Sequence, residues 1–548
     1  MSIGPEDFVS KRITEIKYIV YRDTISTDKL RSTEDYLVRV KNSIKNIVTG
    51  LFGQLIITIT GFISRAFFIY VLGSTYLGVS GLFSNILTLL SFAELGIGQA
   101  IIFSLYKPIA EHDENKICAL MRLYEKVYRF LFVFVLGVGL AFLPLLPYII
   151  KDIDRIPNIH IIYALYVVNS AFSYLFAYRT SFITACQKNY IINGVSFVCN
   201  IVMCTTQVIT LLIFRNYFVY LGIQIAFGFI PNIVSYIYSG KKFPFLNKKN
   251  VSPLPKEELQ KIKDNVKALI MYKVGTLALN STDNIIISSF VGIVTVGVYS
   301  NYTLLTSTVS GFLSSIFGNL TASIGNLNAK ESDEHKLFIF RVINLATFWF
   351  YSVCSICLFI CMTPFINVWI GSDYLLPIST SLIIALNVYI AGMLFAPFNY
   401  RQTMGLFVQG RWRPIVSAII NIAASVVFVQ WWGLAGVLWG TAVARLSTNV
   451  WFDPYLIFKR GMHTSPMPYY IDYLKKAALF IALGAVCWIV AQYIPSTNFL
   501  WVALKAATTF IIANIVIFVC YFRSEEFKYL FGVMKNFRGI MKNDEAVK

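Results

Sequence analysis

Apolar segments alternate with short polar clusters along most of the chain. The apolar segments are about 20 residues long, which is the length that an α-helix needs to cross the hydrocarbon core of a bilayer. The polar breaks include KPIAEHDENK, KDIDRIPN, NAKESDEHK and QGRWRP. The pattern predicts an all-α polytopic membrane protein with about fourteen transmembrane helices, centred near residues 60, 91, 137, 173, 202, 228, 279, 309, 351, 391, 422, 446, 484 and 511.

Two longer polar segments predict how these helices are grouped. The first opens the chain, and the second, GKKFPFLNKKNVSPLPKEELQKIKDN, is rich in lysine and proline, which is typical of a linker. The predicted organisation is a cytoplasmic N-terminal extension (1–45), an N-lobe with spans one to six (46–239), a cytoplasmic linker (240–265), a C-lobe with spans seven to twelve (266–458), spans thirteen and fourteen (459–522), and a cytoplasmic tail (523–548).

The two lobes share features at a constant offset of 219 residues. Gly73 falls on Gly292 and Gly78 on Gly297, so the short turns LGSTYLG and VGIVTVG coincide. Both copies run in the same direction, which indicates a parallel repeat about an axis along the membrane normal. Two pseudo-symmetric six-helix lobes with a central cavity between them are therefore expected, followed by two C-terminal helices.

Composition and charge support a membrane location. Of the 548 residues, 57% are hydrophobic and 14% are charged, against about 25% charged in soluble domains. The net charge is +19. With the N-terminus inside, most of the 47 Lys and Arg lie in predicted cytoplasmic segments, several lie within spans, and only Lys151, Arg155 and Arg215 lie in predicted external segments. The positive-inside rule then places both termini in the cytoplasm. The charge reflects topology and attraction to anionic membrane lipids, so nucleic acid is not expected as a partner.

One basic residue lies well inside the first span, in FISRAFFIYVLGSTYLG. A cation at this depth costs about 2.5–3.5 kcal/mol on insertion scales, so Arg65 needs a polar environment. Helical spacing provides one, because a single face of the span carries Gly50, Gln54, Thr58, Gly61 and Arg65.

Three more spans carry ionisable residues on similar polar faces. The seventh has Lys273, Thr276, Asn280 and Asp283; the twelfth has Thr441, Arg445 and Thr448; and the second has Ser91, Glu94 and Gly98. Such faces are unfavourable against lipid, so we expect them to converge on a common wet cavity with net positive charge.

Alternative roles are open for several of these residues. Arg65 forms either a fixed internal ion pair with Glu94 or Asp283, or a pair that opens when substrate arrives. Lys273 lies in the inner third of its span and either lines the cavity or extends to the cytoplasmic face. Arg179 and Arg401 lie near cytoplasmic ends of spans, where either an interfacial role or a substrate contact is compatible with the sequence.

The sequence contains no sign of a cofactor. The nine cysteines lie in or beside spans, and the stripe of Cys354, Cys357 and Cys361 is typical of helix packing rather than metal ligation. No GxxxxGK[ST] loop is present, so this chain is not expected to hydrolyse ATP. An ion gradient would then drive transport, with Glu94 and Asp283 as the sites for a proton or sodium ion.

Two runs resemble the openings of the halves of bacterial polysaccharide-exporting oligosaccharide flippases. They are RAFFIYVLGSTYLGVSGLFSNILTLLSFAELGIGQAIIFSLYKPIAEHD and DNIIISSFVGIVTVGVYSNYTLL. Two later runs resemble signatures from further along the sequences of that family. They are TACQKNYIINGVSFVCNIV and RQTMGLFVQGRWRPIVSAIINIAASVVFVQWWGLAGVLWGTAVA. The resemblance covers roughly residues 45 to 460. The same superfamily contains multidrug and toxin extrusion transporters and lipid II flippases, whose fold is two six-helix lobes facing a central cavity.

The resemblance implies a flippase rather than an enzyme. It would move an undecaprenyl-diphosphate-linked oligosaccharide from the inner to the outer leaflet of the bacterial cytoplasmic membrane by rocking of the two halves. A diphosphate suits the planar fork of arginine. The predicted substrate-binding set is Arg65, Lys273, Arg445, Arg179 and Arg401. A polysaccharide polymerase and glycosyltransferases are possible partners of such a protein.

Two other functions compete with this interpretation. An organic-cation antiporter of the same fold would favour a cavity dominated by carboxylates and aromatic rings. In these spans the carboxylates are Glu94, Asp283 and a further candidate, Asp453, and several cations oppose them. A membrane-embedded polysaccharide polymerase would require a sizeable external loop for its active site, but the predicted external loops KDIDRIPN and GSDYL are short.

Overall fold

In the computed structural model, the described part of the chain consists of helices joined by turns and short loops. That part is residues 27–532, apart from 91–93, 152, 154–155, 248–253, 261, 264–265, 267–280, 319, 407–408 and 411. No strand occurs within these ranges. The prediction of an all-α polytopic protein is confirmed.

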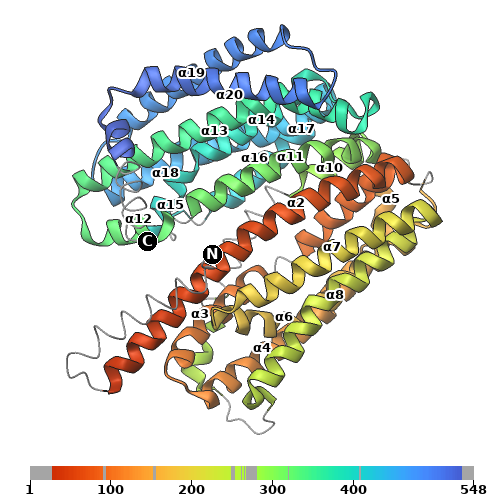
Figure 1. Ribbon diagram of the computed structural model, residues 1–548, viewed down its shortest axis with the longest axis vertical. Coiled ribbons are helices and arrows are strands. Elements are labelled where there is room, and N and C mark those ends of the chain that lie inside the picture. The colour runs from red at the N-terminus through yellow and green to blue at the C-terminus, as the bar shows by residue number, and fades with distance from the viewer. Residues whose placement is uncertain are drawn as a thin grey trace, which may run out of the picture. The chain divides into compact units, whose positions relative to one another are not determined.

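The longer helices of the N-terminal half are α2 (Thr27–Leu90), α3 (Glu94–Ala110), α4 (Glu114–Ala141), α6 (Ile159–Ala185), α7 (Asn189–Phe214) and α8 (Tyr217–Lys242), with the short α5 (Leu146–Ile149) after α4 (Figure 1). After the linker follow α10 (Asp283–Phe290), α11 (Ile293–Gly318), α12 (Leu320–Lys330), α13 (Asp333–Ile370), α14 (Ile378–Met393), α15 (Phe395–Thr403), α16 (Arg413–Trp432), α17 (Leu434–Ala444), the π-helical turn η6 (Arg445–Asn449), α18 (Val450–Leu456), the π-helical turn η7 (Ile457–Gly461), α19 (Met467–Gln492) and α20 (Phe499–Tyr521).

Ten helical segments of the described chain are long and apolar enough to cross a membrane. The other predicted spans are interrupted or more polar. The second comprises the end of α2 and α3, and the eighth is the serine- and threonine-rich α11. The twelfth is broken by η6, and most of the seventh lies outside the described residues. The protein is therefore a multi-pass membrane protein.

Gly73 and Gly292, which the internal repeat aligns, both have positive φ. Gly73 (φ 76°) breaks α2 between the first two predicted spans, and Gly292 (φ 132°) separates α10 from α11. Residues with a Cβ rarely adopt these angles, so glycine is required at both turns. Equivalent turns in the two halves thus both contain a glycine with positive φ.

A second aligned pair, Gly78 and Gly297, lies at a close approach of α2 and α11. A Cβ on Gly78 would come within 2.1 Å of the carbonyl oxygen of Ile293, and one on Gly297 within 2.0 Å of that of Ser74. Glycine at both positions allows the two backbones to touch. The two copies of the repeat therefore meet at equivalent residues.

The described residues divide into two compact units. One takes residues from Met1–Arg65, Ile97–Val133 and Asn169–Asp264, and the other from Ala66–Gly96, Phe134–Val168 and Asn265–Lys548. In the second unit α16 packs along α17, and α13 packs against both α14 and α20. Part of its core consists of Leu313, Phe317, Tyr351, Leu358 and Val388. The predicted lobe boundaries stay a prediction.

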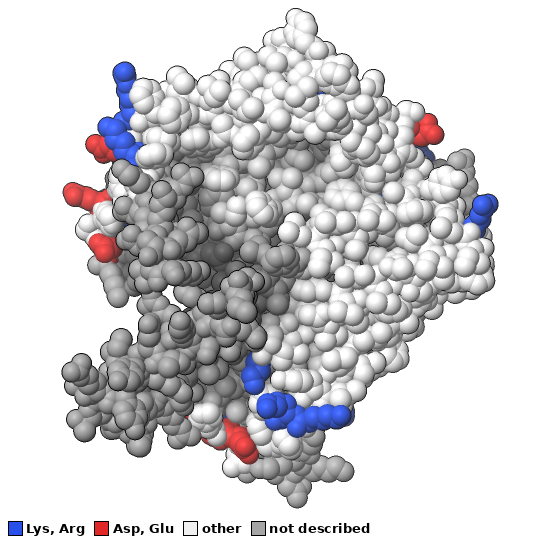
Figure 2. All heavy atoms as spheres, viewed as in Figure 1, with Lys and Arg blue, Asp and Glu red and all other residues white. Residues whose placement is uncertain are grey.

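Charged side chains are unevenly distributed over the second unit. Over its C-terminal helices, Figure 2 shows Lys, Arg, Asp and Glu near the helix ends and an uncharged surface along the helix sides. The exposed side chains of α19 and α20 include Leu474, Ile481, Leu500, Ile511 and Val519. This distribution suits helices whose sides contact hydrocarbon.

Candidate functional site

A cavity of about 380 Å³ in the second unit collects polar residues from several predicted spans. Asp283 begins α10, and Thr441 and Arg445 lie at the end of α17 and the start of η6. The remaining lining residues come from α11, α14 and α17: Tyr299, Thr303, Thr306, Ser307, Ser310, Ile384, Asn387, Val388, Ala391 and Leu438. Two of the ionisable residues predicted to share a cavity, Asp283 and Arg445, therefore do line the same one.

A chain of hydrogen bonds fixes the carboxylate of Asp283. The hydroxyl of Thr441 donates to Asp283 Oδ2 at 3.0 Å, and Asn421 Nδ2 donates to Thr441 Oγ1 at 2.9 Å. Thr282 in turn donates to Asn421 Oδ1 at 3.2 Å. Asp283 Oδ1 is buried and has no hydrogen-bond partner among the described residues. One carboxylate oxygen is thus held in place while the other is available to a cation.

The local backbone also suits a carboxylate here. Asp283 is the first residue of α10, where amide N–H groups without intrahelical partners carry partial positive charge. These groups stabilise an anion at the helix start. The position therefore stabilises an acidic residue that has no basic group at ion-pair distance among the described residues.

Arg445 is held by backbone and amide groups rather than by an acid. Its Nη1 donates to the carbonyl oxygen of Asn387 at 3.1 Å and lies 3.5 Å from Asn387 Oδ1. Within the described chain, no carboxylate lies at ion-pair distance from its guanidinium. The residue is half-buried and lies where α17 gives way to the π-helical turn η6. Such turns are frequent at functional sites, and this one offers a cation to the cavity.

Hydroxyl groups on α11 line another part of the cavity. Four hydroxyl residues are spaced so that they share one face of the helix: Thr303, Thr306, Ser307 and Ser310. The first three donate to carbonyl oxygens within their own helix, at 2.9, 3.2 and 3.0 Å respectively. Because a hydroxyl that donates can still accept, this face presents acceptors suited to sugar hydroxyls or to a hydrated ion.

The other predicted ionisable residues have different surroundings. Arg65 is half-buried on α2, in the first unit. Glu94 is half-buried at the first residue of α3, where the helix start favours an acidic group. Lys273 lies outside the described residues. The predicted roles of all three stay predictions.

Arg179 is buried among aromatic rings of the first unit. Its guanidinium carbon lies 5.5 Å from the ring centre of Tyr178 and 5.1 Å from that of Tyr236 on α8. This cation–π geometry compensates part of the cost of removing the charge from water. A substrate-binding role for Arg179 stays a prediction.

Arg401 belongs to a buried ion-pair cluster. Its Nε lies 3.2 Å from Asp453 Oδ1, and Arg413 pairs with the other oxygen of the same carboxylate. The side chains of Arg401, Asp453 and Arg413 are 1%, 2% and 8% exposed. The cluster joins α15, α16 and α18, which gives Arg401 a structural partner, while its predicted contact with substrate stays a prediction.

Sequence reasoning did not single out Asn387, Asn421 or Tyr299. All three are uncharged residues inside apolar helices, and none completes a periodic polar stripe with the charged positions. The only available signal was a polar side chain within a span, an amide for Asn387 and Asn421 and a phenol for Tyr299, and such groups are common in helix packing. Among the described residues, no group of three or more His, Cys, Asp or Glu could hold a metal ion.

The arrangement of helices defines a fold shared by solved membrane transporters. The chain is similar to the lipid II flippase MurJ in an inward closed conformation, with 15% identity and a TM-score of 0.59, over 88% of this chain and 100% of that one.

It is also similar to an inward-facing multidrug resistance MATE family transporter of the MOP superfamily, with 13% identity and a TM-score of 0.55, over 72% of this chain and 93% of that one. The Vibrio cholerae MATE transporter VcmN, as a D35N mutant, gives 12% identity and a TM-score of 0.50, over 78% and 98% of the chains. No family model and no curated protein matches the sequence. These similarities establish the fold: pseudo-symmetric helical lobes of the MurJ and MATE type.

Proposed function

We propose that this protein is a flippase for an undecaprenyl-diphosphate-linked oligosaccharide, the repeat unit of a cell-surface polysaccharide. It moves this lipid from the inner to the outer leaflet of the bacterial cytoplasmic membrane by alternating access. The observation that carries the proposal is the position of Arg445, a cation with no carboxylate at ion-pair distance in the described chain, beside a cavity with a row of hydroxyls.

The charges of such a substrate explain why an arginine is needed. A diphosphate is strongly anionic, and its transfer from water into a low-dielectric region is costly unless cations and donors compensate it. The guanidinium of Arg445 offers paired N–H donors that match phosphate oxygens. In the proposed mechanism Arg65 and Lys273 add positive charge, and the α11 hydroxyls contact the sugars.

Asp283 is the proposed coupling site. Its Oδ1 has no hydrogen-bond partner within the described chain, and its Oδ2 is fixed through Thr441 and Asn421. A proton or sodium ion would neutralise this carboxylate and leave the positive charge of Arg445 uncompensated. Binding of the ion and binding of the anionic lipid then influence one another electrostatically, which is the requirement for coupled transport. Glu94 is a second candidate for this role.

The proposal is tested by replacing Arg445 in a strain that lacks the chromosomal gene. Arg445→Gln should reduce surface glycan at least about tenfold, as expected for loss of a charge-assisted contact worth more than about 1.4 kcal/mol. Arg445→Lys keeps the charge without the fork and should retain part of the display. Arg523→Gln removes an exposed cation that does not line the cavity and serves as the matched control.

Protein abundance in the membrane is measured for each variant. Glycan display at the wild-type level by Arg445→Gln would refute a phosphate contact at this residue. Equal loss in Arg445→Lys and Arg445→Gln, with normal abundance, would indicate that the planar fork is essential.

A multidrug or organic-cation antiporter is the alternative function. It is favoured by the fold shared with MATE transporters and by the accessible carboxylate oxygen of Asp283. Ethidium efflux from cells that express the protein distinguishes the two. Efflux that depends on Asp283, together with unchanged surface glycan after gene deletion, would support the antiporter and reject the flippase.

A further inference from the structure

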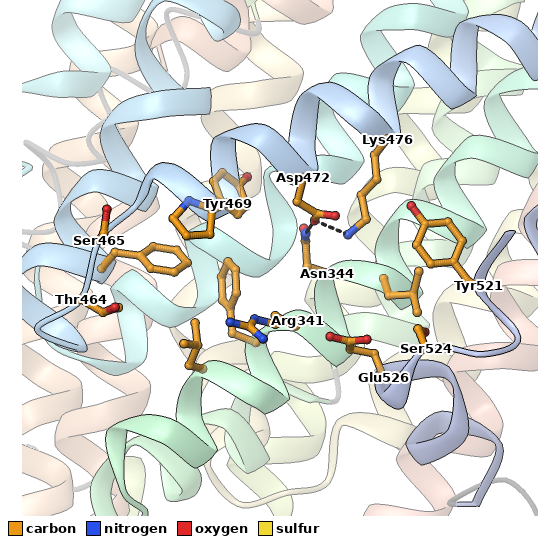
Figure 3. A pocket seen from close by; sticks show the side chains of 15 residues that line it. Arg341, Asn344, Thr464, Ser465, Tyr469, Asp472, Lys476, Tyr521, Ser524 and Glu526 are labelled. Atoms are coloured by element: carbon orange, nitrogen blue, oxygen red, sulfur yellow. Dashed lines mark hydrogen bonds and ion pairs between the residues drawn. The ribbon is translucent and has the colours of Figure 1, made fainter.

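A second cavity, of about 320 Å³, lies in the same unit between the N-terminal part of α13 and the first turns of α19. Residues that follow α20 close one side, and Thr464 and Ser465 line it just before α19 (Figure 3). It shares no lining residue with the Asp283 cavity. The proposed transport site therefore does not explain it.

The charges of the ionisable groups that line this cavity sum to zero. Its lining contains two cations, Arg341 and Lys476, and two carboxylates, Asp472 and Glu526. Lys476 is 3% exposed, and its Nζ lies 2.7 Å from Asp472 Oδ2, as the dashed line in Figure 3 marks. Arg341 and Glu526 lie across from this pair in the view of Figure 3. A lining without net charge favours a ligand that carries both a positive and a negative group.

Three acceptors that line the cavity, one of them buried, are positioned for a donor. Asn344 is 1% exposed, and its Nδ2 donates to Asp472 Oδ2 at 3.4 Å, while its Oδ1 has no hydrogen-bond partner in the described chain. The carboxylates of Asp472 and Glu526 line the same space. These three acceptors match in number the three N–H donors of a primary ammonium group. Such a group would give Asn344 Oδ1 the partner that the described chain does not supply.

Arg341, which lies beside Glu526 in the view of Figure 3, offers a cation to a phosphate. Arg341 is exposed, and among the described residues it forms no ion pair. The hydroxyls of Thr464 and Ser465 line the cavity as further polar groups. Apolar side chains form another part of the lining and suit contact with the glycerol region of a lipid. They are Leu337, Phe340, Leu345, Phe458 and Pro468.

With the predicted topology, the cavity lies at the depth of the lipid headgroups. Arg341 lies eight residues into α13, or about 12 Å from its first residue, and α19 enters the cavity through its first turns. The predicted topology puts both of these helix starts on the cytoplasmic side. The cavity then opens at the level of inner-leaflet headgroups.

We infer that this cavity binds the headgroup of a zwitterionic phospholipid with a primary ammonium, of the phosphatidylethanolamine type. Its phosphate contacts Arg341, and its ammonium donates to Glu526, Asp472 and Asn344 Oδ1. A choline headgroup has no N–H donors and cannot make these bonds. A phosphatidylglycerol headgroup brings a negative charge without the balancing ammonium.

Native mass spectrometry of the full-length protein, purified in detergent and mixed with equal amounts of three lipids, tests the inference. The lipids are dioleoyl phosphatidylethanolamine, phosphatidylcholine and phosphatidylglycerol. The wild-type protein should retain phosphatidylethanolamine about tenfold over phosphatidylcholine, as expected for charge-assisted hydrogen bonds. Glu526→Gln should reduce this preference to near unity. Glu525→Gln, which changes the adjacent residue outside the cavity lining, should keep it.

Arg341→Gln should weaken retention of all three lipids, because each has a phosphate, whereas Arg523→Gln should not. Equal retention of phosphatidylethanolamine and phosphatidylcholine by the wild-type protein would overturn the inference. So would a preference for phosphatidylglycerol, which would indicate a site for anionic lipids instead. Glu526 lines the cavity and the neighbouring Glu525 does not, so indistinguishable lipid preferences of Glu526→Gln and Glu525→Gln would also overturn the inference.

Discussion

Thr441 illustrates, at the scale of single residues, how one hydroxyl connects two helices. It accepts a hydrogen bond from Asn421 and donates one to Asp283, so its loss affects both partners. Helical spacing predicted that Thr441 shares a face with Arg445. It did not predict the hydrogen bond from Thr441 to Asp283. The period of a helix shows which of its residues share a face, but it does not show which residue of a neighbouring helix contacts that face.

Thr441→Val should destabilise the protein, because the substitution keeps the shape and removes the hydroxyl. Asp283 Oδ2 and Asn421 Nδ2 then lose a buried partner, which typically costs about 1–3 kcal/mol. Thermal unfolding in detergent measures the effect. Thr441→Ser keeps both bonds and is the control; if the two variants melt at the same temperature, the hydrogen-bond chain does not contribute to stability.

The buried carboxylate of Asp453 allows a second prediction at this scale. Asp453→Asn keeps the side-chain shape but leaves Arg401 and Arg413 buried without its charge, and breaking such a pair costs about 3–5 kcal/mol. A large fall in melting temperature and in membrane abundance is expected.

The control for this prediction is Glu125→Gln, which breaks the exposed pair with Arg129. Exposed pairs contribute about 0–1 kcal/mol, so this variant should resemble the wild type. Similar melting temperatures for Asp453→Asn and Glu125→Gln would contradict the structural importance of the cluster.

At the scale of elements, the repeat in the sequence corresponds to contacts between helices. Gly73 and Gly292 adopt positive φ, and Gly78 and Gly297 permit backbone contact between α2 and α11. The offset of the repeat predicted that these glycines are equivalent. It did not predict that Gly78 and Gly297 meet, because a repeat aligns positions without giving the path between them.

Gly78→Ala should destabilise the contact of α2 with α11. The added Cβ would lie 2.1 Å from a backbone oxygen that no side-chain rotation can move, so the helices must separate. Overpacking of this kind costs about 1–3 kcal/mol. Gly137→Ala on α4 is the control, because no atom lies within 4 Å of its Cβ, and its stability should be unchanged or higher by up to about 1 kcal/mol.

Melting curves in detergent and protease sensitivity compare the two glycine variants. If Gly78→Ala is as stable as Gly137→Ala, the close approach of α2 and α11 is not a constraint on the folded protein.

At the scale of the whole molecule, the basic residues predict orientation. Fusion of alkaline phosphatase, which is active only outside the cytoplasm, at the C-terminus should give no activity. Fusion after Arg155, in a predicted external loop, should give high activity. Green fluorescent protein at the C-terminus should fluoresce, because that end is expected inside. The opposite pattern in these fusions would refute the predicted topology.

The sequence by itself determined that this is a helical multi-pass membrane protein, because the length and apolarity of a span depend only on local composition. It also placed ionisable residues on polar faces, because the helical period is fixed. The tertiary structure decided which of those faces meet. It put Asp283 and Arg445 beside one cavity, joined Asp283 to Thr441 and Asn421, and gave Arg401 a carboxylate partner. These contacts join residues up to 158 positions apart in the chain. Packing of helices against each other, rather than any local pattern, sets such distances.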